Sequence, residues 1–470
     1  MPADLKLDEI AMPVNVSLTR RLANFVVSID TRSLPPEVLE KARTCLLNGY
    51  GMALGSHTTP FAPVARAAVL AMDGRVDTGG ATLLGDGRKT TMGGAALANS
   101  ALFHGRAQED TCGAAHLGAI MIPLLTAMIE ARSWPVERLI PALVAGYEVG
   151  GLIESVYSTK TTPSGLRASP LYGVIAAAAA AARLMDLPAD RTAAAIANAA
   201  SFAGGILQSF DDGTDEWRYQ VGVAGRQGLI AAELAKAGSV SAPHALEGRN
   251  GFVRAFARMD CDVDALAARL GRDWLMHRVT FKPYPVCAFN QTPVTAGLVL
   301  RERIAGRAIN AVRVRMNPFE TGYAGMDSKG PFNSVSGTLM SIPFCIANTL
   351  INGVPSMVHM TTYTDPRVNA LIGQVDLLAD ESVPRLSCVI ELDLQDGSAL
   401  VQEQRMTAAD YSYGRDQVSE LVRRIGTESG VPGAVYDSLE SFVAHPDQGI
   451  GVVLACFAAL PSVLQEGVSA

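Results

Sequence analysis

Apolar residues recur at three- and four-residue spacing along most of the first 270 residues, and this pattern predicts amphipathic helices. Residues 17–29, 35–55 and 59–72 are clear examples, and the second starts with proline, which the first turn of a helix tolerates. Residues 135–157 are apolar on most sides, so we expect a buried helix there. Helices therefore dominate the predicted fold of this part of the chain.

An alanine-rich stretch, residues 171–188, lies in the middle of this helical region and includes seven successive alanines, 176–182. Alanine favours helix and lets neighbouring helices approach closely. Two more helices follow over 189–206 and 222–238, for which we expect caps at Asp190 and Gly238. The segment thus predicts tightly packed helices.

The pattern changes between residues 278 and 412. Alternating apolar and polar positions predict strands over 309–319, 384–397 and 399–406. Apolar residues at three- and four-residue spacing predict helices over 336–353 and 365–378. After residue 412 the helical pattern returns. The prediction is a mainly α protein with a smaller α+β domain: an all-helical body of residues 1–277 and 413–470, with a lid-like domain of residues 278–412 inserted in it.

Composition and charge narrow the possible partners. The 470-residue chain carries a formal charge of −7 and has no run of Lys or Arg, which argues against nucleic-acid binding. The most apolar runs, 117–129 and 171–185, are too short to span a membrane, and the first residues do not resemble a signal peptide. Seven cysteines without C-x-x-C spacing indicate a reducing compartment. We expect a soluble cytoplasmic protein without a membrane partner.

A polar cluster, FHGRAQEDTCGAAH at 103–116, interrupts two apolar segments. His104, Asp110 and His116 are its candidate catalytic residues, because histidine titrates near neutral pH and a nearby aspartate can orient the ring. The alternatives are structural: His104 bonded at a helix end, Asp110 as the cap of the next helix, and His116 as an ordinary loop residue. The spacing matches no set of metal ligands, so we expect no metal.

Motifs for other chemistries are missing from the sequence, which has no GxGxxG after a strand, no Walker A loop, no HExxH and no GxSxG. A free Cys287 is more commonly a buried thiol than a nucleophile. The sequence therefore carries no motif of a dinucleotide site, a phosphate-binding loop, a zinc protease or a serine hydrolase.

Four stretches of the chain together resemble the MmgE/PrpD family, which includes methylcitrate dehydratases, cis-aconitate decarboxylases and iminodisuccinate epimerases. They are GGAALANSALFHGRAQEDT with His116, SGLRASPLYGVIAAAAAAARLMDL, FVRAFA with FKPYPVCAFNQ, and SIPFCIANTLING. The resemblance extends over nearly the whole chain in the same order. It implies a helical body with a smaller inserted domain, a homodimer formed through the helical bodies, and cofactor-independent chemistry on small carboxylates.

The sequence departs from the family pattern at several positions. Ala107 stands where the family has an acid, and Arg167 and Gln291 stand where it has histidines. The counterpart of a family lysine is Trp217 or Arg218. These differences indicate a divergent subfamily with other acid and base groups.

Five polar residues are candidate substrate-binding groups: Arg167, Arg218, Lys282, Gln291 and Tyr323. An arginine at a helix start can hold a carboxylate with two hydrogen bonds, and a lysine between two domains often lies in a ligand cleft. The structural alternatives are a surface charge for Arg167, pairing with nearby acidic residues for Arg218 and an interdomain salt bridge for Lys282. Gln291 can bind but cannot titrate, and Tyr323 lies on a glycine-rich loop that could close over the site.

The expected function is that of a cofactor-free lyase, a dehydratase or a decarboxylase, which abstracts a proton next to a carboxylate of a small substrate. An isomerase or epimerase that uses the same proton chemistry is the first alternative. A non-catalytic binding protein on the same fold is the second.

Overall fold

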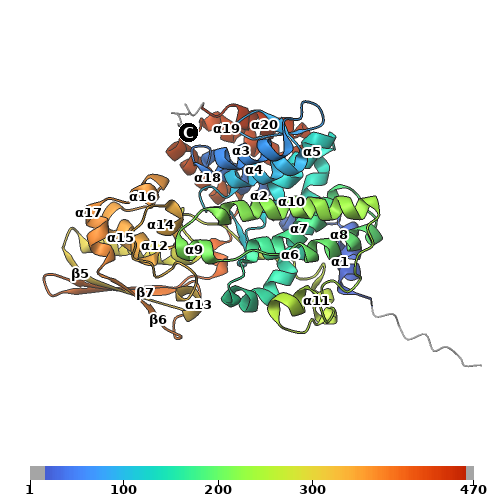
Figure 1. Cartoon of the computed structure of the whole chain (residues 1–470). Helices are drawn as coiled ribbons and strands as arrows, with labels where there is room; N and C mark the ends of the chain where they lie inside the picture. Colours follow the sequence, from blue (N-terminus) through green and yellow to red (C-terminus); the bar gives the residue numbers. More distant parts are fainter. Residues whose placement is uncertain (1–15, 462–470) are drawn as a thin grey trace, which may run out of the picture.

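The computed structural model describes residues 16–461. Helices pack on one another to form a body, and a smaller part of the chain has helices packed on one face of a sheet (Figure 1). The prediction of a mainly α fold with a smaller α+β domain is confirmed.

The body is formed by the helices before residue 270 and after residue 414. They are α1 (Leu18–Ser28), α2 (Pro36–Gly55), α3 (Phe61–Asp73), α4 (Met92–Phe103), α5 (Gly118–Arg132), α6 (Leu139–Thr161), α7 (Ala168–Leu184), α8 (Ala189–Ser201), α9 (Gln208–Asp212), α10 (Glu216–Ala237), α11 (Val263–Arg269), α18 (Arg415–Ser429), α19 (Gly433–Ala444) and α20 (Gly451–Ala458). The late helices α18 and α19 pack against α2, so both ends of the described chain contribute to the body.

The alanine-rich helix α7 lies between α6 and α10, and its alanines 176–182 are fully buried. Glycines on the neighbouring helices allow this packing. A Cβ atom at Gly150 of α6 would lie 2.6 Å from the Ala176 Cβ, and one at Gly228 of α10 would lie 2.8 Å from the Ala178 backbone nitrogen. The small residues therefore bring the three helix backbones into close contact.

Within the described residues, one helical stretch, 136–164, is long and apolar enough to cross a bilayer. However, 89% of its most apolar window is buried inside the protein. It is therefore a core helix, as the apolar pattern of residues 135–157 predicts.

Two expectations about helix starts are wrong. The helix predicted from residue 222 begins at Glu216, and this start places Trp217 and Arg218 on the helix. The apolar pattern does not reveal this first turn, because one of its two buried side chains, Arg218, is charged. The cap of α8 is Pro188, and Asp190 lies within the first turn, where it pairs with Arg20. The Gly238 cap is confirmed, with a left-handed φ of 106°.

The sheet of the smaller part has the strand order β6-β5-β7-β8. β5 (Ile309–Met316) pairs in parallel with β6 (Val375–Ala379) and antiparallel with β7 (Cys388–Leu394), which pairs antiparallel with β8 (Ala399–Gln404). The helices of this part are α12 (Gln291–Ile304), α13 (Pro318–Thr321), α14 (Val335–Met340), α15 (Ile342–Asn352), α16 (Met357–Thr361) and α17 (Pro366–Ile372). Residues 375–378, predicted as the end of a helix over 365–378, lie in β6 instead, because the helix ends at Ile372 and the buried Val375 pairs with Val312 of β5.

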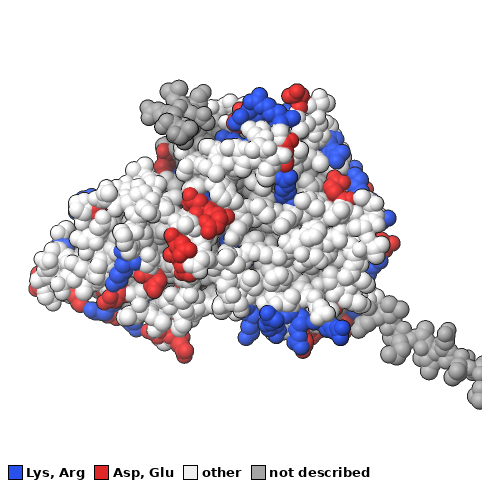
Figure 2. Space-filling model, viewed as in Figure 1, with Lys and Arg blue, Asp and Glu red and all other residues white. Residues whose placement is uncertain are grey.

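Alternation along β5 separates the two faces of the sheet. Val312 and Val314 are buried, and α12 and α15 pack against the sheet strands. Arg313 on the other face contacts Asp393 at 2.7 Å, and Arg315 contacts Glu391 at 3.0 Å. Acidic and basic side chains are accordingly mixed at this end of the molecule, and much of the rest of the face in Figure 2 is uncharged.

The close packing around α7 predicts that Gly228→Ala destabilises the protein. The added Cβ meets backbone atoms, and we expect a cost of about 1–3 kcal/mol, partly offset by the higher helix propensity of alanine, about 1 kcal/mol. The melting temperature measured by calorimetry should fall by roughly 1–2 °C, because the unfolding entropy of a chain of this length is about 1 kcal/mol/K. Gly433→Ala is the matched control, because nothing lies within 4 Å of a Cβ at this helical position. An equal loss in both variants would contradict the packing argument.

Candidate active site

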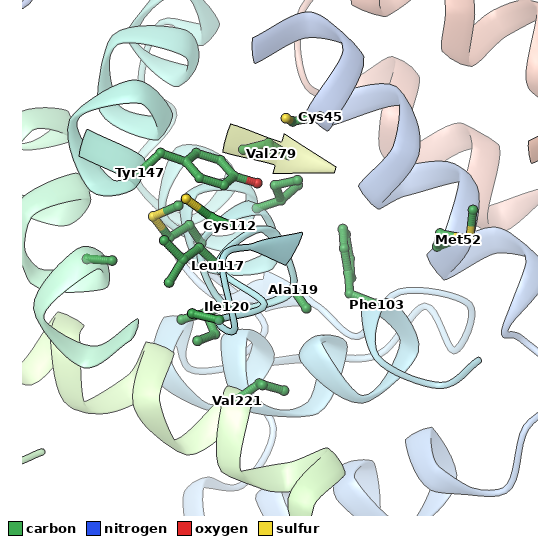
Figure 3. Close-up of a cluster of buried hydrophobic side chains, with 14 of the residues drawn as sticks. Cys45, Met52, Phe103, Cys112, Leu117, Ala119, Ile120, Tyr147, Val221 and Val279 are labelled. Carbon is green, nitrogen blue, oxygen red and sulfur yellow. The ribbon is translucent and has the colours of Figure 1, made fainter. Parts of the chain in front are cut away.

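A short two-stranded ribbon joins two segments that are far apart in the sequence and positions the side chains of the site. β3 (Thr111–Cys112) pairs antiparallel with β4 (Val279–Thr280). Figure 3 shows Cys112 and Val279 of this ribbon within a cluster of buried side chains that also includes Tyr147. Because Glu109 precedes one strand and Lys282 follows the other, the pairing brings these two side chains together.

Glu109 lies at the centre of the cluster and is almost fully buried. Its Oε1 accepts a hydrogen bond from Lys282 Nζ at 2.7 Å and lies 3.0 Å from His116 Nδ1, and its Oε2 lies 3.0 Å from His104 Nδ1. Burial would raise the pKa of Glu109, but His104, Lys282 and His116 together hold it well below its usual range. The carboxylate is therefore ionised, and Lys282 is its charge partner. The sequence analysis assigned no role to Glu109.

His104 is fully buried at the end of α4. Its Nε2 lies 2.7 Å from Arg167 Nη2, and because a guanidinium has only donors, this ring nitrogen accepts. In the neutral ring the proton then sits on Nδ1, which faces Glu109. Burial lowers the pKa of His104 to about 4. His104 is thus neutral at neutral pH, and both of its nitrogens face protein groups.

His116 has a different environment, because its side chain is 17% exposed and lines a cavity. Its Nδ1 faces two acceptors, Glu109 Oε1 at 3.0 Å and the Asp110 carbonyl oxygen at 3.2 Å, so Nδ1 carries the proton. No residue of the described range 16–461 hydrogen-bonds to Nε2. Burial, together with the charge of Lys282, lowers the pKa of His116 well below its usual value. The neutral ring therefore offers a basic lone pair at Nε2.

Asp110 points away from the cavity. Its Oδ2 accepts a hydrogen bond from the Tyr147 hydroxyl at 2.6 Å, and its carboxyl group lies against Gly118, where any side chain would clash. Burial raises the pKa of Asp110 to about 6. The structure therefore places Asp110 where it holds the loop against α5 and α6.

The two predicted arginines bond to the end of α4 and the residues that follow it. Arg167 donates to His104 and to the Trp217 carbonyl, and Arg218 Nη1 donates to the carbonyls of His104 and Gly105 at 2.8 and 2.7 Å. The Arg218 guanidinium is also fully buried beside the rings of Phe61 and Trp217. Neither arginine lines the cavity. Both fix the backbone and the histidine at the end of α4.

Gln291 and Tyr323 line the cavity, the first with its amide bonded to the backbone and the second with its ring packed on another ring. Gln291 Nε2 donates to the carbonyls of Tyr284 and Val286, both at 3.0 Å, and its Oε1 accepts from the Tyr284 amide at 3.1 Å. Its polar atoms are thus engaged with the backbone. Tyr323 packs its ring against Phe289, with 5.2 Å between ring centroids.

The cavity has a volume of about 400 Å³ and lies between the body and the sheet-containing part. Its charged lining residues and those with hydroxyl, amide or imidazole groups are Glu109, Thr111, His116, His277, Arg278, Thr280, Lys282, Gln291, Tyr323, Arg385 and Tyr411. Sequence reasoning missed His277, Arg278 and Arg385, because single cations in turns carry no pattern. Among residues 16–461 no group of three or more His, Cys, Asp or Glu side chains is arranged to hold a metal ion.

A second, larger cavity of about 590 Å³ lies on the other side of Tyr323. Its charged lining residues are Asp211 and Asp327, and Asp211 already accepts a hydrogen bond from the Gly325 amide. This cavity lacks the acid and base cluster, so the smaller cavity is the candidate active site.

The sequence of this chain is similar to those of known proteins. The family model for the MmgE/PrpD N-terminal domain matches residues 20–262, more than half of the chain. Two similar proteins are cis-aconitate decarboxylases of Aspergillus terreus, 24% identical over 74% of both chains and 25% identical over 71% of this chain and 72% of the relative. A third is the cis-aconitate decarboxylase-like protein oryM of Aspergillus oryzae, 28% identical over 57% of this chain and 58% of the relative. The chain belongs to the MmgE/PrpD family.

Proposed function

We propose that the protein is a cofactor-independent lyase that removes a proton or CO2 next to a carboxylate of a small substrate. One observation carries the proposal: His116 presents an unprotonated Nε2 to a cavity in which Lys282 supplies a cation. The names of the relatives, cis-aconitate decarboxylases, support a lyase of this type.

The proposed first step is a proton transfer to His116. Nε2 takes the proton from the carbon next to the carboxylate, while Glu109 faces the Nδ1–H and stabilises the imidazolium that forms. The electron pair of the broken C–H bond moves onto the carboxylate as an enolate-like charge. Lys282 lies beside this position and stabilises the charge.

The second step defines the kind of lyase. In a dehydratase the electron pair returns to form a double bond, and a hydroxyl group leaves from the adjacent carbon with a proton. A decarboxylase omits the proton abstraction: the C–CO2 bond breaks and leaves its electron pair on the carbon, and this carbon then takes a proton from water or from the protonated form of His116. An isomerase would return the proton to another face or carbon.

The remaining expectations belong to the same proposal. The protein works as a homodimer in a cytoplasmic, reducing environment. Its seven cysteines are all free, and this state supports the reducing compartment.

The first test is His116→Ala. The protein is incubated with cis-aconitate and a panel of small hydroxy acids in D2O, and proton NMR records product formation and deuterium incorporation. We expect His116→Ala to lower turnover about 10²–10⁴-fold, because a positioned base contributes that much. His244→Ala, at an exposed histidine, is the control. Vinyl signals or CO2 loss identify the lyase, exchange without conversion identifies the isomerase, and full activity of His116→Ala refutes the proposal.

The second test is the pH dependence of kcat/KM. Because burial and Lys282 lower the pKa of His116, the base stays unprotonated through pH 6.5, and activity should fall only at more acidic pH. An acidic limb at or above pH 6.5 in the wild-type protein would contradict the assignment.

The third test removes the cation next to the base. Lys282→Met should move the acidic limb upward toward pH 6.5, because the ammonium charge no longer opposes protonation of His116. Lys282→Arg keeps the charge and should keep the limb at its wild-type position. Identical limbs in Lys282→Met and Lys282→Arg would show that Lys282 does not tune the base.

A further inference from the structure

A row of aromatic rings forms one side of the active-site cavity. The rings of Trp217 and Phe210 have centroids 5.2 Å apart, those of Phe210 and Tyr323 5.9 Å apart, and those of Tyr323 and Phe289 5.2 Å apart. All four line the cavity, and we call them the aromatic wall. The wall begins at the catalytic cluster, because the Trp217 ring lies 4.7 Å from that of His104.

The wall presents mostly carbon to the cavity. The polar edge of Trp217 is engaged elsewhere, since its Nε1 donates to Ser336 Oγ at 3.1 Å. Leu339 and Met340, which are almost fully buried, extend the apolar lining. Such a surface gains free energy by contact with an apolar group of a ligand.

Cations are few in the interior of the cavity. Lys282 is the buried cation there, and it shares its charge with Glu109 at 2.7 Å. Of the other basic lining residues, Arg385 is exposed, and Arg278 contacts Glu154 at 3.5 Å. Arg167 and Arg218 are bonded to the protein behind the loop. The interior therefore suits one carboxylate beside Lys282 better than a compact cluster of three.

We infer that the substrate is a small carboxylic acid that carries an apolar substituent of about the size of a phenyl or branched alkyl group. Its reacting carboxylate lies beside Lys282 and His116, and its substituent lies against the aromatic wall. This inference rests on the proposed function, because the carboxylate end is placed by the acid and base groups of that proposal.

Two acids with the same skeleton test the inference. Benzylsuccinate and tricarballylate are both succinate with a CH2 substituent, which ends in phenyl in the first and in a carboxylate in the second. Isothermal titration calorimetry of the full-length protein gives the dissociation constant of each. We expect benzylsuccinate to bind at least about tenfold more tightly, as the burial of a phenyl-sized group against an apolar wall implies. Equal affinities, tighter binding of tricarballylate, or binding of neither acid would overturn the inference.

Substitutions in the aromatic wall test whether the phenyl group of benzylsuccinate binds there. Phe289→Ala should remove most of the preference for benzylsuccinate and change the affinity for tricarballylate less than about threefold, and Phe289→Leu should restore part of the preference. Met340→Gln, which replaces an apolar lining residue by a polar one of similar size, should weaken benzylsuccinate binding if Phe289→Ala fails to fold. Phe256→Ala removes a ring that packs on Phe252 outside the cavity, and the preference should persist in it. A preference that survives both Phe289→Ala and Met340→Gln would overturn the inference.

The two proposals fail in different ways. If tricarballylate binds more tightly while turnover still depends on His116, the apolar substituent is excluded and the lyase proposal stands. If benzylsuccinate is preferred through the wall while His116→Ala keeps full turnover, the proposed catalytic assignment fails although the cavity still selects apolar acids.

Discussion

The buried ion pair between Glu109 and Lys282 is the interaction on which the site depends. A carboxylate removed from water at this depth is stable only with a charge partner and further polar contacts. Lys282 supplies the charge, and the rings of His104 and His116 occupy the remaining sides of the carboxylate. The arrangement holds His116, Lys282 and Glu109 in one cluster, so the orientation of each follows from the other two.

Much of the fold could be predicted from the sequence, because helix periodicity and strand alternation are local properties. The helices around the alanines of α7 and the strands β5, β7 and β8 follow directly from these patterns. The strand β6 was missed, because its apolar residues continue a helical pattern and only pairing with β5 makes them a strand. The early start of α10 was missed because its first turn buries a charged side chain, Arg218, beside Trp217, and so lacks the apolar spacing that indicates a helix.

The site was predicted as a region but not in its detail. The spacing of the polar residues identified the loop, yet which carboxylate faces the cavity depends on how the loop turns, and Glu109 takes the place that Asp110 was expected to fill. Arg167 and Gln291 stand where the family resemblance leads one to expect histidines, and their polar atoms bond to other protein groups. These two positions keep the shape of the site without supplying groups that titrate near neutral pH, so its acid and base chemistry falls to fewer residues.

The ribbon of β3 and β4 is only two residues long on each side, yet its pairing places Lys282 beside Glu109. If these strands fail to pair, Lys282 does not reach the loop, and Glu109 is left as a solitary charge in an apolar interior. Such a charge costs several kcal/mol. Wrongly docked arrangements of the two parts are thereby penalised during folding, and the chemical groups of the site also act as a check on the assembly of the molecule.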